Sequence, residues 1–336
     1  MFFLCIILLI LVSLLLNTKI SSEKRMNFFD KDSTDALRGI CAIFIILNHY
    51  GQHTFGEAYQ SLAGRIFMFS GSCSVGFFFL ISGYANYLSY YKNGNKKLHW
   101  LIKVLKIFAT VETINIIENF LFSQTWTISK FNIFNTGYWF IIVLMALYVV
   151  LYIDLKWFDK YSIVVLWGIT LIYILILRRF NISHTWYNSI ACFSLGVTVA
   201  KHKEMLFNIL EKINSKLIMI LLAPIVSYMY YMTITYEAPK YNVIVALVFN
   251  IFVILYLYEF NFHFKLWSLL GGLSLELFIW HERMLIQVLQ KEQTSVDLTQ
   301  FVIILTMTVT LSLLVKWIIN SSTVRIRNRF TLVKAD

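Results

Sequence analysis

The stretch Asp35-Ala-Leu-Arg-Gly-Ile-Cys-Ala-Ile-Phe-Ile-Ile-Leu-Asn-His-Tyr50 encloses an apolar run between ionisable side chains. If this stretch is a helix, Arg38 and His49 share a face, because eleven residues make three turns plus about 20°. Their Cα atoms then lie about 16.5 Å apart along the helix axis. This spacing suits a long ligand that is anionic at the Arg38 end and reacts at the His49 end. An interfacial arginine and a buried, hydrogen-bonded histidine explain the spacing equally well, so both interpretations stay open at this point.

Similar apolar runs recur along the whole chain. Of its 336 residues, 59% are hydrophobic and only 14% are charged, which is too little charge for the surface of a soluble domain. In a bilayer such runs form helices, because a helix satisfies its own backbone hydrogen bonds. We predict an all-α, polytopic transmembrane helix bundle with ten core helices and one extra N-terminal helix. The expected helices cover residues 2–16, 39–55, 66–88, 101–122, 138–153, 161–177, 187–200, 217–236, 241–260, 268–288 and 299–319.

The basic residues sort to alternate connections between these spans. If the connection 17–38 is cytoplasmic, the inner segments carry 21 Lys and Arg, the outer segments carry 6, and 2 lie within spans, which accounts for all 29. This excess follows the positive-inside rule and predicts a multi-pass cell-membrane protein with a cytoplasmic C-terminus. It also explains the net charge of +11 through contact with membrane lipids, so we expect no nucleic-acid partner.

The first apolar run has no basic residue before it and no clear cleavage site after it, which disfavours a signal peptide. We assign residues 1–25 to an extra N-terminal hydrophobic segment and residues 26–336 to the main transmembrane domain. The segment is either an additional helix whose N-terminus lies outside, or it precedes the true start of translation at Met26. In both cases we expect it to be dispensable for chemistry.

Further ionisable groups lie inside the spans, where lipid tolerates them poorly and each becomes a candidate functional residue. Lys103 and Lys106 share a helix face at the inner end of their span. A phosphate site needs such a pair, although the inner belt of positive charge explains it as well. On a later span, Glu276 and Arg283 share a face, whereas His281 points about 140° away from Glu276.

His49 and His53 have the spacing of two zinc ligands on a helix, but the glutamate of the H-E-x-x-H motif is missing. We therefore predict no metal site. The sequence also lacks a Gly-rich phosphate loop, so Arg and Lys side chains would have to hold any nucleotide-bearing ligand.

Taken together, these segments resemble the acyltransferase family 3 membrane proteins, which transfer acyl groups, usually acetyl, to sugars of cell-surface glycans. The resemblance covers roughly residues 30–320 and rests on five motifs in the family's order. They are Asp35-x-x-Arg38-Gly39 followed by His49, Gly76-Phe-Phe-Phe-Leu-Ile-Ser-Gly-Tyr84, the pair Lys103 and Lys106, Tyr138-Trp-Phe140, and Ser274-Leu-Glu-Leu-Phe-Ile-Trp-His281. The family's basic pair is usually Arg-x-x-Arg. Lysine cannot form the bidentate hydrogen bonds that arginine forms with phosphate.

The resemblance implies an acyl-CoA donor, most often acetyl-CoA, that enters from the cytoplasm. His49 would be the base that deprotonates the acceptor hydroxyl, directly or through an acyl-histidine intermediate, because histidine titrates near neutral pH. Either Glu276 or Glu118 would orient His49. Three basic residues would hold the CoA phosphates: Arg38, Lys103 and Lys106.

On the substrate side, the resemblance implies an acyl path or sugar site near Trp139, Tyr84, Ser82 and His281, although core packing explains Trp139 and Tyr84 equally well. The acceptor would be a cell-surface or exported glycan, or a lipid-linked sugar. The main alternative is a secondary transporter or polysaccharide exporter, which would also combine many helices with intramembrane charges. A transporter typically has two paired halves, and the sequence contains no convincing internal repeat.

Overall fold

The computed structural model describes residues 2–24, 28–92, 97–122, 139–236, 241–289 and 296–332. Every apolar span expected from the sequence coincides with helical structure, so the all-α class is confirmed. The main helices are α1 (Phe2–Asn17), α3 (Lys31–His53), α6 (Gly71–Lys92), α7 (Lys97–Phe122), α8 (Trp139–Phe158), α9 (Ser162–Arg179), α10 (Ala191–Lys201), α12 (Ser215–Tyr236), α13 (Asn242–Glu259), α15 (Ser274–Val288) and α16 (Leu298–Leu332). The shorter elements are β1 (Thr18–Ile20), α4 (Phe55–Ala58), α5 (Leu62–Met68), η3 (Asp159–Tyr161), η4 (His184–Trp186), α11 (Lys203–Lys212), β2 (Phe260–Phe262) and α14 (Lys265–Gly272).

Within the described residues, five helical stretches are long and apolar enough to cross a membrane. They are Leu62–Lys92, Trp139–Arg179, Ser215–Tyr236, Asn242–Glu259 and Leu298–Ser321. Helices α3 and α7 do not meet this measure, because their sequences contain the charged and histidine side chains singled out above. The helices support a membrane protein, while the count of ten core helices plus one stays a prediction.

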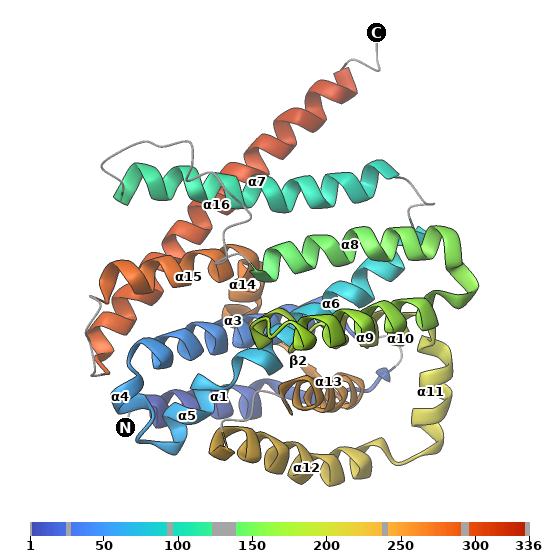
Figure 1. Cartoon of the computed structure of the whole chain (residues 1–336), viewed down its shortest axis with the longest axis horizontal. Coiled ribbons are helices and arrows are strands. Elements are labelled where there is room, and N and C mark those ends of the chain that lie inside the picture. The colour runs from blue at the N-terminus through green and yellow to red at the C-terminus, as the bar shows by residue number, and fades with distance from the viewer. Residues whose placement is uncertain are drawn as a thin grey trace.

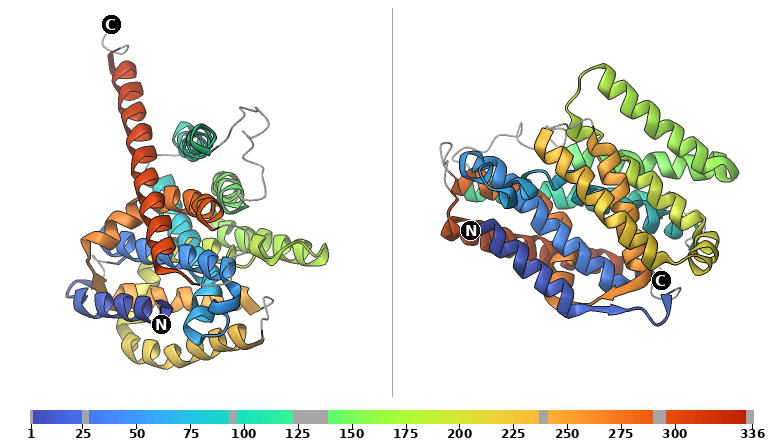
Figure 2. Two further views of the ribbon diagram at one scale, coloured as in Figure 1. Left: turned by 90° about the vertical axis from the view of Figure 1, so that its left-hand side faces the viewer. Right: turned by 90° about the horizontal axis from the view of Figure 1, so that it is seen from below.

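The helices run between two ends of the molecule (Figure 1). The N-terminus, α4 and α5 lie at the left end of this view, and α11 and the turn between α8 and α9 lie at the right end. The left end therefore gathers segments that the charge distribution predicts to be outside, and the right end gathers segments predicted to be cytoplasmic. Figure 2 shows that the C-terminal part of α16 extends beyond the other helices.

Two helix crossings depend on glycines of the sequence motifs. A Cβ atom on Gly39 would overlap the carbonyl oxygen of Trp267, so α3 and α14 approach through their backbones. Helices α6 and α10 cross in the same way where Gly83 faces Gly196. Small residues permit this close approach between helices in a membrane. The crossing at Gly39 matters for the site, because it brings the start of α15 next to α3.

The substitution Gly39→Ala should destabilise the protein by about 1–3 kcal/mol, because the added methyl group meets backbone atoms that cannot rotate away. Thermal unfolding of the purified protein in detergent measures this loss. Gly168→Ala is the matched control, since a Cβ there has nothing within 4 Å and alanine favours the helix. Equal unfolding temperatures for the two variants would contradict the proposed backbone contact.

The N-terminal segment packs against the main domain. Phe2 contacts the rings of Tyr50 on α3 and Phe301 on α16, with centroids 5.9 and 5.2 Å apart. Further along, β1 pairs antiparallel with β2, with Thr18 opposite Phe262. The segment is therefore part of the packed fold, and its dispensability for chemistry stays a prediction.

The expected helix over residues 268–288 is divided at Leu273 into α14 and α15. The adjacent glycines Gly271 and Gly272 explain the break, because glycine weakens a helix. The Lys316 ammonium donates to the carbonyl oxygen of Gly272 at this point. The break starts a new helix at Ser274, directly beside α3.

Candidate active site

A cleft of about 370 Å³ lies between α3, α6, α7, α8 and α15. Arg38 of α3 lines it together with Lys103 and Lys106 of α7. The sequence pairs the two lysines on one helix but cannot establish that α3 and α7 meet at a common cavity. The structure brings all three basic residues together.

Two hydrogen bonds fix the side chain of Arg38. Its Nη1 donates to Asp35 Oδ1 at 2.8 Å, one turn earlier on α3, and its Nη2 donates to Ser274 Oγ at 2.7 Å. The second bond depends on the helix crossing at Gly39, which brings the start of α15 within reach. Because a guanidinium has five N–H donors, these two bonds orient it and leave it able to bind an anion.

Lys103 is held by α6, which forms another wall of the cleft. Its Nζ donates to Asn86 Oδ1 at 2.8 Å and to Ser89 Oγ at 2.9 Å. Ser82 lines the cleft one turn before Asn86, whose side chain donates to the Ser82 carbonyl at 2.8 Å. Lys106 is exposed on the cleft wall. Neutral oxygen partners leave the Lys103 charge available to an anionic ligand.

Glu276 also lines the cleft and is 8% exposed. Its carboxylate interacts electrostatically with Lys316, Lys106 and Arg38. It therefore lies among the basic residues as their counter-ion. An anionic ligand would take over part of this role when it binds.

The other end of the cleft is apolar and leads toward His49 through a row of rings. Phe140 and Phe278 line the cleft with their centroids 4.5 Å apart. Phe278 lies edge-on to His281 at 5.6 Å, and the His281 ring lies 4.9 Å from that of His49. Phe278 on the cleft wall is therefore separated from His49 by one ring, that of His281.

His49 lies in a cluster of titratable groups formed by α3 and α15. Its Nδ1 is 3.0 Å from Glu282 Oε2, and His53 Nε2 is 3.5 Å from Glu282 Oε1. His281 is 2% exposed, and its Nδ1 lies 3.1 Å from the Leu277 carbonyl oxygen. The side chains of His49 and Glu282 are 32% and 41% exposed, so a substrate can reach them.

The carboxylate beside His49 is Glu282, which the sequence analysis did not single out. Glu276 lies in the basic part of the cleft, and Glu118 forms an ion pair with Arg283, whose Nη2 also donates to Asn115 Oδ1 at 2.7 Å. The structure therefore gives the orienting role a different candidate from the two expected. Helix geometry predicts which residues share a face of α15, but it does not predict which of these faces packs against α3.

The lining of the cleft does not include three of the expected substrate residues: Tyr84, Trp139 and His281, whose ring contacts that of His49. Tyr84 stacks on Phe29 with centroids 4.4 Å apart, because it points about 200° around α6 from Ser82. Trp139 packs beside Phe140 at 6.0 Å, and Phe140 is the residue that lines the cleft. These contacts match the core-packing explanation of Tyr84 and Trp139.

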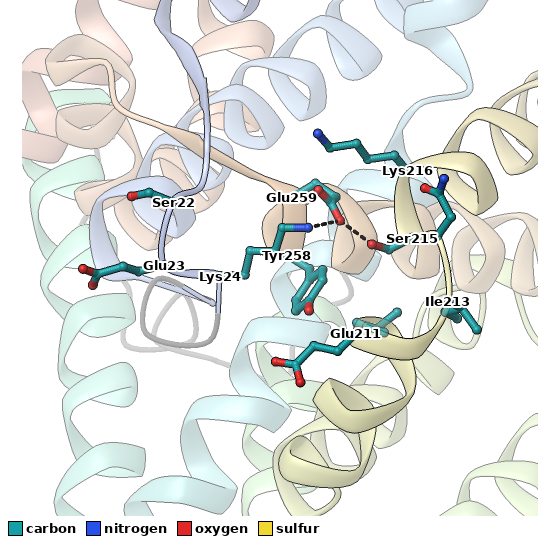
Figure 3. Close-up of a pocket in the computed structure, with 11 residues that line it drawn as sticks. Ser22, Glu23, Lys24, Glu211, Ile213, Ser215, Lys216, Tyr258 and Glu259 are labelled. Carbon is teal, nitrogen blue, oxygen red and sulfur yellow. Dashed lines mark hydrogen bonds and ion pairs between the residues drawn. The ribbon is translucent and has the colours of Figure 1, made fainter.

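A second cavity, of about 500 Å³, lies where the N-terminal segment meets α12 and α13. Figure 3 shows Lys24 and Ser215 on either side of Glu259, whose side chain is fully buried. Lys24 Nζ is 2.6 Å from Glu259 Oε1, and the Ser215 hydroxyl donates to the same oxygen. Its lining has three acidic residues and two basic ones, whereas the lining of the first cleft has three basic residues and one carboxylate. We therefore place the candidate site in the basic cleft.

The fold and this cleft define a helical membrane protein with three basic residues in one cleft and a histidine–glutamate pair outside its lining. A family model described as an acyltransferase domain matches residues 31–317, and the chain belongs to the acyltransferase 3 family. The resemblance seen in the sequence is thereby confirmed. No curated protein and no solved structure is significantly similar to the chain.

Proposed function

We propose that this chain is a membrane-embedded O-acyltransferase that moves an acetyl group from cytoplasmic acetyl-CoA to a hydroxyl group of a cell-surface or exported glycan, or of its lipid-linked precursor. Membership of the family supports acyl transfer. The observation that carries the finer proposal is the cleft itself, in which three cations lie beside an apolar wall that His281 separates from His49.

The donor follows from the charges in the cleft. Coenzyme A has several phosphates at one end and its thioester at the other, joined by an extended arm. Arg38, Lys103 and Lys106 provide positive charge where the phosphates would bind. The apolar end of the cleft suits the arm and the acetyl group, and the axial distance of about 16.5 Å between Arg38 and His49 suits an elongated donor.

His49 is the proposed general base. Its Nδ1 lies against Glu282, so its Nε2 would be the atom that accepts the proton of the acceptor hydroxyl. The hydroxyl oxygen attacks the thioester carbonyl carbon, the C–S bond breaks, and the CoA thiolate leaves. The leaving sulfur takes the proton back from His49. The products are an acetyl ester on the sugar and free coenzyme A, and His49 ends as it began.

The direction of transfer follows from the charge distribution along the chain. The basic end of the cleft belongs to the side that the positive-inside rule predicts to be cytoplasmic, where acetyl-CoA is made available. His49 and His53 lie toward the other end of α3 and meet an acceptor that arrives from the outer side. The protein would therefore bring the donor and the acceptor together from opposite sides of the membrane.

Mass spectrometry of surface glycans, from cells with and without the gene, tests this proposal. We expect a mass increment of about 42 Da per acetylated hydroxyl, the net addition of C₂H₂O, to disappear with the gene and to return with the wild-type chain. The amount of exported glycan should not change. Loss of export with normal acetylation would contradict the proposal and favour a transporter or exporter.

A further inference from the structure

The cluster around His49 contains more ligand-type side chains than acyl transfer requires. His49 and His53 come from α3, and His281 and Glu282 come from α15. His49, His281 and Glu282 each offer one ligand atom, and these three atoms lie within 4.8 Å of one another. The sequence expectation of no metal considered only the two histidines of α3. The fold adds a third histidine and a carboxylate to them.

His281 provides an independent sign that the cluster receives a ligand. Its Nδ1 contacts the Leu277 carbonyl at 3.1 Å, and because a carbonyl oxygen only accepts, this nitrogen must carry the proton. The Nε2 atom of the neutral ring then has a lone pair. This atom is buried and has no hydrogen-bond partner in the part of the chain that the structure describes. Leaving a buried polar atom unsatisfied is costly, so the arrangement favours an added partner.

The same backbone contact is typical of histidines that bind metals. A metal-bound histidine usually donates its other ring N–H to a carbonyl or a carboxylate, which fixes the tautomer and the orientation of the ring. His281 meets this condition through Leu277. His53 is not one of the three ligand residues, but it contacts Glu282, because its Nε2 lies 3.5 Å from Glu282 Oε1.

We infer that His49, His281 and Glu282 form a binding site for a divalent transition-metal ion of the zinc type. Two histidines and one glutamate are a donor set of known catalytic zinc sites, which keep a fourth position open for water or substrate. Bonds of about 2.0–2.2 Å require ligand atoms roughly 3.3–3.6 Å apart, so small side-chain rotations suffice to close the present group around an ion. The partial exposure of His49 and Glu282 provides a route for entry.

One consequence of this site rests on the proposed function. A metal bound to His49 takes a lone pair of the ring and restricts its movement, so His49 cannot accept a proton from the acceptor at the same time. Metal binding would then inhibit acetyl transfer, and removal of the metal would restore it. The existence of the site does not depend on this consequence.

Titration of the purified, EDTA-treated full-length protein with Co²⁺ tests the site directly. Cobalt replaces zinc in such sites, and its visible absorption bands report the geometry of coordination. We expect bands that saturate at about one ion per chain. Glu282→Gln and His281→Gln should each lower the apparent affinity by at least about tenfold, the smallest loss seen when even an outer-shell partner is removed.

The control is His263→Gln, because His263 is an exposed histidine near Asp32 and lies outside the cluster. This variant should bind Co²⁺ like the wild type, and thermal unfolding should verify that all variants are folded. No saturable bands in the wild type, or unchanged bands in both ligand variants, would overturn the site. Bands that disappear in the His263 variant would place the ion elsewhere and overturn it as well.

The metal site and the proposed function can be tested independently of each other. Acetyl transfer measured with and without Zn²⁺ should fall on addition of the ion and recover with EDTA. If Co²⁺ binds as expected but the protein transfers no acetyl group, the proposed function fails and the site stands. If acetyl transfer occurs and Co²⁺ does not bind, the site fails and the function stands.

Discussion

Replacing His49 with alanine should reduce acetyl transfer by about 10²–10⁴-fold, the contribution typical of a positioned general base. Without the imidazole, no group at this position accepts the proton of the acceptor hydroxyl, and a neutral alcohol is a weak nucleophile. The measurement is the acetyl content of surface glycans in cells that carry the variant in place of the wild-type gene. Transfer from labelled acetyl-CoA in membranes measures the rate directly.

The binding of coenzyme A distinguishes a lost base from a lost fold. Because His49 lies outside the lining of the cleft and eleven residues along α3 from Arg38, the variant should still bind coenzyme A with an affinity close to that of the wild type. His184→Ala is the matched control, since His184 is a half-buried histidine of η4 outside the cleft and the His49 cluster. Wild-type acetylation in the His49 variant would refute the proposed base.

Replacing Arg38 with alanine should weaken coenzyme A binding by roughly 10–150-fold, because a hydrogen bond to a charged group contributes about 1.5–3 kcal/mol. The variant loses a cation from the cleft and leaves Glu276 there with fewer counter-ions. Both effects oppose an anionic ligand. Calorimetric titration of the purified protein with coenzyme A measures the change, and added salt should weaken wild-type binding because charges dominate it.

Arg178→Ala separates this local effect from a change in net charge. Arg178 lies in the last turn of α9 and is exposed outside the cleft, so its removal changes the net charge equally without touching the site. We expect wild-type affinity for coenzyme A in this control. Equal losses in the two variants, or an unchanged affinity in the Arg38 variant, would contradict the assignment of the cleft to the phosphates.

The basic part of the site was predictable from sequence because the spacing of its residues places them on one face of a single helix. Arg38 and His49 share a face of α3, and Lys103 and Lys106 share a face of α7, as helix geometry requires. The ordered motifs then indicated the family. What the sequence does not contain is which face of one helix meets which face of another.

Glu282 illustrates this limit. It follows His281 directly, so a pattern of ionisable residues marked the segment, but the carboxylates proposed to orient His49 were Glu276 and Glu118. Its position beside His49 depends on the break at Leu273 and on the crossing of α14 with α3. The crossing comes from a glycine contact between segments more than 200 residues apart in the chain, Gly39 with Trp267. No local periodicity reports such a contact.

The small strand pair was not predictable for a related reason. Strands of three residues give no usable alternation, and β1 and β2 each follow directly after a long apolar helix. Their pairing closes the connection between the N-terminal segment and the end of α13. Only the assembled bundle brings these two chain segments together.

This pairing also determines when during synthesis β1 can form its contacts. Thr18 emerges from the ribosome early, but its partner Phe262 is made 244 residues later. At about 5–20 residues per second, the delay is roughly 12–50 s. During that interval neither the β1–β2 pair nor the Lys24–Glu259 ion pair can form. The contacts of the N-terminal segment with the end of α13 and with β2 are therefore completed only after most of the chain has been made.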